Sequence, residues 1–77
     1  MPTVLRKDGY RFFFFSNEGS EPPHIHVEQA GAYAKFWLSP VTLHYSSGFT
    51  SGQLTKLRNL VVDFNDYFKE CWHEYFF

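Results

Sequence analysis

The segment Ser46-Ser47-Gly48-Phe49-Thr50-Ser51-Gly52-Gln53-Leu54 decides the fold, because the hydrophobic pattern changes on passing through it. Thr50 and Gln53 have the spacing of a capping box, so we expect a helix to begin at Thr50. Asn65-Asp66 interrupts the strong helix formers and predicts a kink or short turn within a helical segment over residues 50–75. Beyond the segment, apolar residues recur at the three- and four-residue steps of an amphipathic helix: Leu54, Leu57, Val61, Phe64, Phe68 and Trp72.

Before this segment, short apolar runs alternate with turn residues, which is typical of β-strands. Asp8-Gly9 lies between two β-forming runs and predicts a hairpin, and Ala30-Gly31 predicts a second tight turn. The predicted fold is α+β: an antiparallel β-meander of four to five strands within residues 3–45, followed by a C-terminal helix or broken helix pair packed on one sheet face. The expected strands are residues 3–6, 10–16, 24–29 and 33–38, with a short fifth at 41–45.

The composition limits the kinds of protein that this chain can be. Its 77 residues suffice for a single small domain, 1–77, and 44% hydrophobic residues exclude a disordered chain. Seven Lys and Arg against eight Asp and Glu leave a net charge of −1, so the overall positive charge of a dedicated nucleic-acid binder is missing. The one cysteine excludes an internal disulfide, and no apolar run has the length of a signal peptide or membrane span. We therefore expect a cytoplasmic protein that contacts no membrane.

The most distinctive motif is Pro22-Pro23-His24-Ile25-His26-Val27-Glu28. Side chains alternate along a strand, so the two histidines share one face with Glu28, while the aliphatic pair Ile25 and Val27 points inward. This geometry should aim both imidazoles at an accessible pocket on the polar face, which basic residues on neighbouring strands are placed to join. The candidate catalytic residues are His24, His26, Arg11 and Lys35.

Three interpretations of the histidine pair stay open. The first is metal-free RNA cleavage, with the histidines as acid–base groups and the two basic residues stabilising negative charge. The second is a metal-dependent hydrolase, whose third ligand would have to be His44 or His73, because Glu28 is too far along the strand from His24. In the third, the imidazoles only hydrogen-bond across strands. Our main prediction includes neither a bound metal nor a cofactor.

Two aromatic regions are candidates for contact with a partner protein. The run 12–15 carries rings to both faces of one strand, so the second set of rings needs cover from the following loop or from a partner. Residues 73–74 fall off the buried helical stripe and should point to solvent, in an acidic segment suited to a basic partner. A non-catalytic homodimer is the alternative. The predicted partner-binding residues are Phe13, Phe15, Trp37, His73 and Glu74.

Several blocks of this sequence resemble the small bacterial proteins of domain-of-unknown-function family 4160. The most specific block is Glu-Pro-Pro-His-Ile-His-Val-Glu at 21–28, and the others are residues 2–6, 9–14, 34–38 and 72–76. The family has no established activity. Its genes often lie beside those of a second small family, numbered 2442. The resemblance therefore implies one component of a two-gene, toxin–antitoxin-like module that binds a small cognate protein from the neighbouring gene.

The chain departs from the pattern of this family at Leu43-His44-Tyr45 and at residues 65–68, so the resemblance implies no role for His44. The histidine motif is also similar to that of the histidine-triad nucleotide hydrolases, but Glu28 stands where their third histidine would be, and we do not transfer their activity. We predict a small bacterial protein that binds a cognate protein and, if it is an enzyme, acts on RNA as a metal-free ribonuclease.

Overall fold

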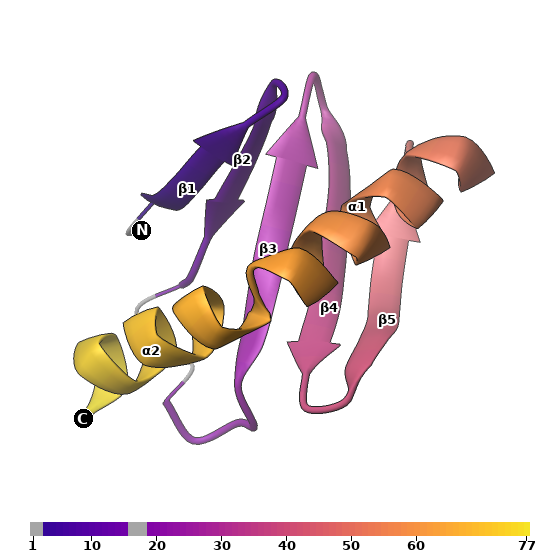
Figure 1. Cartoon of the computed structure of the whole chain (residues 1–77). Coiled ribbons are helices and arrows are strands. Elements are labelled where there is room, and N and C mark those ends of the chain that lie inside the picture. The colour runs from indigo at the N-terminus through magenta and orange to yellow at the C-terminus, as the bar shows by residue number, and fades with distance from the viewer. Residues whose placement is uncertain (1–2, 16–18) are drawn as a thin grey trace.

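The computed structural model describes residues 3–15 and 19–77, and this part of the chain forms five strands followed by two helices. The strands make one antiparallel sheet in the order β1-β2-β3-β4-β5. Both helices cross the same face of the sheet (Figure 1), so the predicted α+β meander is confirmed. The elements are β1 (Thr3–Lys7), β2 (Tyr10–Phe13), β3 (His24–Gln29), β4 (Ala32–Leu38), β5 (Val41–Ser47), α1 (Ser51–Asp63) and α2 (Asn65–Phe76).

Two tight turns lie at the same end of the sheet, between β1 and β2 and between β3 and β4 (Figure 1). The φ angles are 53° at Asp8 and 84° at Gly9, and 48° at Ala30 and 85° at Gly31. Positive φ at both turn residues matches the right-handed twist of the flanking strands, as in type I′ hairpins. Both turns predicted from the sequence are therefore present.

Two strand ends differ from the prediction by at least two residues. β2 ends at Phe13, whereas we expected a strand through residue 16, which lies outside the described residues. β5 continues to Ser47, two residues beyond its predicted end. The register between β4 and β5 shifts because Lys35 pairs with Tyr45 while the next residue, Phe36, pairs with Leu43. The extra residue is a bulge that breaks the alternation from which a strand is recognised.

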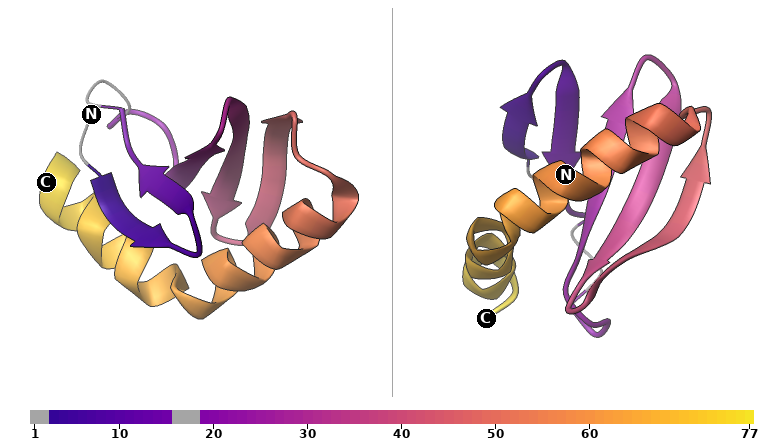
Figure 2. Two further views of the ribbon diagram at one scale, coloured as in Figure 1. Left: turned by 90° about the horizontal axis from the view of Figure 1, so that it is seen from above. Right: turned by 45° about the vertical axis from the view of Figure 1, so that its right-hand side comes forward.

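The first helix, α1, begins where the capping signal places it. The Thr50 hydroxyl accepts a hydrogen bond from the Gln53 amide at 3.1 Å, and the Thr50 amide donates to the Gln53 side chain at 2.9 Å. This reciprocal pair is the predicted capping box. The predicted break occurs at Phe64, directly before Asn65-Asp66, and Figure 2 shows the change of direction between α1 and α2.

The hydrophobic core fills the space between the helices and the sheet. α1 packs over β4 and β5, and α2 packs over β3 and β4. The inward orientation predicted for Ile25 and Val27 is confirmed, since both belong to the hydrophobic core. The core side chains come from strands and helices alike, and they include Phe12, Phe14, Phe36, Leu38, Leu57, Val61, Phe68 and Trp72.

Candidate functional site

The four candidate catalytic residues lie on the sheet surface opposite the helices, which we call the far face. Antiparallel pairing sets Arg11 opposite Glu28, and His26 opposite Lys35. The rings of His24 and His26 are 5.0 Å apart between centroids. The common face expected from strand alternation is therefore observed, and the catalytic roles stay predictions. The far face consists of Arg11, Phe13, His24, His26, Glu28, Tyr33, Lys35 and Trp37, with Phe15 packed against His26.

His26 is packed inside the aromatic layer of the far face and is only 2% exposed. Its ring stacks on Phe13 at 5.4 Å and on Tyr33 at 5.7 Å, and Phe15 meets it edge-on at 4.6 Å. Its Nδ1 atom is 2.6 Å from the Tyr33 hydroxyl oxygen. This hydrogen bond satisfies a buried polar atom and fixes the orientation of the imidazole.

His24 is fully buried at the start of β3, where β2 no longer accompanies the strand. Trp72 from α2 approaches its ring to 4.7 Å, and Trp37 from β4 lies at 5.4 Å. The Nδ1 atom of His24 is 2.9 Å from the carbonyl oxygen of Pro22. Because a carbonyl only accepts, this contact places the proton of the neutral imidazole on Nδ1.

Arg11 is held by contacts on several sides of its guanidinium group. Its Nη1 donates to Glu28 Oε1 at 2.7 Å, and its Nε donates to Thr3 Oγ1, also at 2.7 Å. The Phe13 ring centroid lies 4.5 Å from the guanidinium carbon, a cation–π distance. The charge of Arg11 is thus neutralised by a carboxylate and its orientation is fixed.

Lys35 connects the far face to the loop between β2 and β3. Its ammonium group donates to Glu21 at 3.0 Å and lies 4.7 Å from the Trp37 ring centroid. The carbonyl of Pro23 in the same loop accepts a backbone hydrogen bond from Leu38 at 3.1 Å. The end of the loop is therefore anchored to β4 directly before the histidines begin.

Other side chains cover the histidine pair. The prediction of an accessible pocket around the two imidazoles is therefore wrong. Strand alternation fixes the face of the sheet on which a side chain lies, but not whether that side chain is exposed. The two histidines are covered by Phe15, Trp72 and other residues outside the motif. Both imidazoles are at most 2% exposed. An acid–base role on RNA would require these covers to move away.

Within residues 3–15 and 19–77, no group of three or more His, Cys, Asp or Glu side chains is arranged to hold a metal ion. His44 packs against Trp37 at 5.1 Å between ring centroids, and His73 stacks on Phe77 at 5.2 Å. Neither therefore serves as the third ligand that a metal-dependent hydrolase built on the histidine pair would need.

The predicted partner-binding residues occupy two separate regions. Phe13 is 2% exposed and is covered within the chain, so its ring offers no surface to a partner in this conformation. Phe15 and Trp37 are half-buried on the far face. His73 and Glu74 are exposed on α2, as their position off the buried stripe led us to expect.

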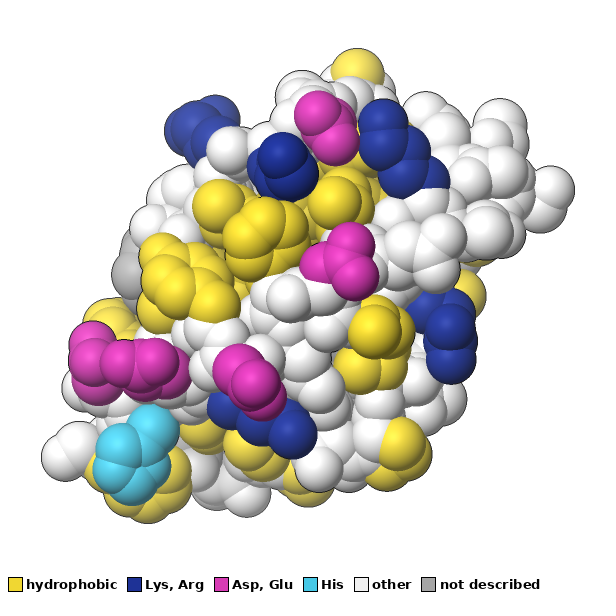
Figure 3. Space-filling view, viewed as in Figure 1, with side chains coloured by type: hydrophobic (Ala, Val, Ile, Leu, Met, Phe, Trp, Pro, Cys, Tyr) yellow, Lys and Arg dark blue, Asp and Glu magenta, His cyan; other side chains and the backbone are white. Residues whose placement is uncertain are grey.

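A groove of about 290 Å³ between β1 and α2, the β1–α2 groove, was not among our predictions. Figure 3 shows hydrophobic side chains gathered over β1 and the neighbouring part of the helices, with acidic side chains beside them. The signal that was missed is a second helical stripe, 67, 71, 74 and 75, at the spacing of one helix face. The residues that line the groove are Val4, Phe14, Cys71, Glu74 and Tyr75.

Tyr67 joins α2 to β1 beside this groove. Its hydroxyl donates to the Val4 carbonyl oxygen at 2.8 Å. A side-chain hydrogen bond with Cys71 and the charge of that thiolate are the main causes that raise the pKa of Tyr67 above its ordinary 10.0, with smaller contributions from burial and from Glu74 and Glu70.

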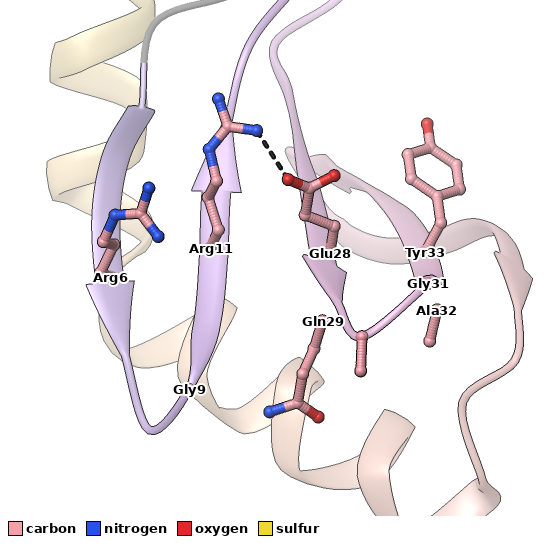
Figure 4. Close-up of a pocket in the computed structure, with 9 residues that line it drawn as sticks. Arg6, Gly9, Arg11, Glu28, Gln29, Gly31, Ala32 and Tyr33 are labelled. Carbon is pink, nitrogen blue, oxygen red and sulfur yellow. Dashed lines mark hydrogen bonds and ion pairs between the residues drawn. The ribbon is translucent and has the colours of Figure 1, made fainter.

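A second groove, of about 570 Å³, lies on the far face beside the two tight turns, and we call it the hairpin groove (Figure 4). Arg6, Arg11, Glu28 and Tyr33 line it together with residues of both turns. Arg6 and Arg11 are direct cross-strand neighbours. We predicted only Arg11 as a site residue. The missed signal was the two-residue Asp8-Gly9 turn, which sets residues 6 and 11 opposite one another.

In the described part of the chain, no helix is both long enough and apolar enough to cross a membrane.

Comparison with known proteins places the chain in a family. The family model described as "Domain of unknown function (DUF4160)" matches residues 9–73. No curated protein and no solved structure matches the chain. The matched range runs from the first tight turn through the histidine motif into α2, and so includes β2 to β5 and α1 in full and α2 as far as His73. The chain belongs to family DUF4160.

Proposed function

We propose that this chain is a protein-interaction module that binds a small cognate protein through the β1–α2 groove. The groove itself supports the proposal, because its apolar walls carry an acidic residue, Glu74, at the same site. Tyr67 and Tyr75 on this side of α2 are 45% and 46% exposed. Exposed aromatic side chains around an apolar depression are enriched at protein interfaces and supply most of their binding energy.

The charge of α2 indicates the chemistry of the partner. This helix contains three acidic residues, Asp66, Glu70 and Glu74, against Lys69, which leaves two net negative charges with histidine neutral. A complementary partner segment presents an apolar or aromatic side chain flanked by Lys or Arg. The volume of about 290 Å³ is at the lower limit of small-molecule pockets, which favours a side chain as the occupant.

The partner in this proposal is the product of a neighbouring gene, and the chain is one component of a two-gene, toxin–antitoxin-like module. The histidine motif then has a packing role, because His24 and His26 are buried beneath aromatic rings. The conformation described here supports this role better than it supports RNA cleavage.

Co-expression with the neighbouring gene tests the proposal. We expect the two products to co-purify and the pair to differ from either gene alone in its effect on growth. Tyr75→Ala should weaken binding by about 2 kcal/mol or more, the loss typical of an aromatic anchor, and Glu74→Lys should weaken it by charge repulsion. The affinities are measured by titration calorimetry on purified proteins.

Tyr45→Ala is the matched control, because Tyr45 is a similarly exposed tyrosine, at 54%, on β5. The proposal fails if Tyr75→Ala and Tyr45→Ala bind equally well, or if the two products neither co-purify nor affect growth. Analytical ultracentrifugation of the isolated chain tests whether it forms a homodimer. Self-association that is lost in Tyr75→Ala would identify a second copy as the occupant and overturn the cognate-protein proposal.

A further inference from the structure

The hairpin groove brings two arginines together on neighbouring strands. Arg6 of β1 and Arg11 of β2 are paired directly, and Figure 4 shows both guanidinium groups on the same side of the sheet. Like charges at directly opposite positions destabilise an antiparallel pair. A negatively charged group between them would convert this repulsion into attraction.

The acidic side chain in the groove balances only one of the two arginines. Glu28 pairs with Arg11 at 2.7 Å and fixes its guanidinium together with Thr3. Arg6 is exposed and has no hydrogen-bond or ion-pair partner within residues 3–15 and 19–77. The charged side chains that line the groove therefore carry one net positive charge, two from arginine less one from Glu28.

The groove is open to a ligand at the turns. Its volume is about 570 Å³, and a Cβ atom added at Gly31 would meet nothing within 4 Å. The ring of Tyr33 is stacked on His26 and lies 5.8 Å from the ring of Tyr45. Because this ring is already packed on both of these neighbours, recognition in the groove depends on charge.

We propose that the hairpin groove binds a phosphomonoester group between Arg6 and Arg11. Guanidinium groups present planar pairs of N–H donors that match the oxygens of phosphate. A phosphomonoester carries a charge of about −1.5 to −2 at pH 7, enough to offset the net charge of the groove and the repulsion between the arginines. The group can belong to a free phosphorylated metabolite or to the 5′ end of an RNA.

NMR titration of the ¹⁵N-labelled chain tests this site with four probes: inorganic phosphate, glucose 6-phosphate, a 5′-phosphorylated RNA hexamer and the same hexamer with a 5′-hydroxyl. We expect saturable shifts of the Gly9 and Gly31 amides and of Arg6 Nε with every probe except the 5′-hydroxyl hexamer. Arg6→Ala should weaken binding roughly tenfold, a factor equivalent to about 1.4 kcal/mol. Binding should be stronger at pH 7.5 than at pH 5, because the second ionisation of the phosphate falls near pH 6.

Lys7→Ala is the matched control, because Lys7 follows Arg6 on β1 and points to the opposite face. It removes the same charge and should leave the affinity nearly unchanged. Because Arg6 is exposed, we expect Arg6→Ala to stay folded. The ¹⁵N spectrum of the variant checks this. Tighter binding of glucose 6-phosphate identifies a metabolite as the source, and tighter binding of the phosphorylated hexamer identifies an RNA end.

Three results would overturn the proposal. The first is the absence of saturable shifts with every phosphate probe. The second is equal binding of the two RNA hexamers, which would mean that the RNA backbone is recognised without its terminal phosphate. The third is an equal loss of affinity in Lys7→Ala and Arg6→Ala, which would mean that the total charge of the chain controls binding.

Discussion

Both faces of the sheet contain buried side chains, but these side chains differ in kind between the two faces. On the helix-facing side, Phe12, Val27 and Phe36 are at most 1% exposed and pack in a purely hydrophobic core. On the far face, His26 is 2% exposed and packs among aromatic rings, with a hydroxyl as its hydrogen-bond partner. Within residues 3–15 and 19–77, the far face thus gains a buried layer of aromatic rings and paired polar groups, while both helices lie over the other face of the sheet.

This difference predicts how each face responds to mutation. The helix-facing core depends on filled volume, because its residues are clamped between sheet and helices. The far face depends on matched partners, because a polar group that is buried without one is costly. The predictions below separate these two dependences.

The largest expected effect compares neighbouring residues of β2 that point to opposite faces. Phe12→Ala should lower the free energy of unfolding by about 3–5 kcal/mol, the usual cost of a large cavity in a core. Phe13→Ala should lower it by less, because the side chains of Arg11 and Phe15 can relax into the space. Urea denaturation of both variants measures the difference. Equal losses would mean that the far face is packed as rigidly as the core.

The second prediction concerns the hydrogen bond between Tyr33 and His26. Tyr33→Phe keeps the ring but removes the hydroxyl at 2.6 Å from His26 Nδ1. We expect a loss of about 1–3 kcal/mol, the cost of depriving a buried polar atom of its partner. In the Tyr33→Phe background, His26→Phe should cost less than it does in the unaltered chain. A double-mutant cycle measures this coupling, and simple additivity would contradict the matched-partner interpretation.

The third prediction compares two ion pairs of different burial. In the pair between Arg11 and Glu28, the side chains are 18% and 46% exposed and the atoms are 2.7 Å apart. In the pair between Lys56 and Asp8, they are 54% and 44% exposed at 3.8 Å. Glu28→Gln should cost about 1 kcal/mol, whereas Asp8→Asn should have nearly no effect. A larger loss in Asp8→Asn, measured by urea denaturation, would contradict this order.

The smallest expected effect is a loss of stability at alkaline pH. The pKa of Tyr67 is raised above 10.0 in the folded chain, so the stabilisation is fully present below pH 10 and is lost as the pH rises through the folded-state value. The main causes are the side-chain hydrogen bond with Cys71 and the charge of that thiolate, which disfavour the ionised form of Tyr67 in the folded chain. Solvent exposure keeps the effect small. Thermal denaturation between pH 8 and pH 11 should show this loss in the unaltered chain, and a smaller one in Tyr67→Phe.

Local sequence signals predicted most of the fold. The Asp8-Gly9 turn and the Thr50 to Gln53 capping box depend on residues next to one another in the chain, and both are present. The bulge at His44 escaped prediction because the register of β5 is set by its pairing with β4. No signal within the β5 sequence itself reports that pairing.

The candidate site was predicted only in part, because alternation along a strand is a local signal whereas burial depends on distant residues. Alternation along β3 placed His24 and His26 on one face, which the structure confirms. Their burial was missed because Trp72 lies almost fifty residues away in the sequence and meets His24 only where β2 has ended. The two grooves are likewise products of tertiary packing, between β1 and α2 and between the hairpin turns.

Trp72 contacts both buried layers: its ring lies 5.2 Å from that of Phe14 in the core and 4.7 Å from that of His24 on the far face. During synthesis, every strand leaves the ribosome before this residue does. A nascent chain that has not yet reached residue 72 therefore leaves the start of β3 uncovered on the helix side. The start of β3 can therefore close only after α2 has emerged, so a chain truncated before Trp72 would imitate this incomplete state.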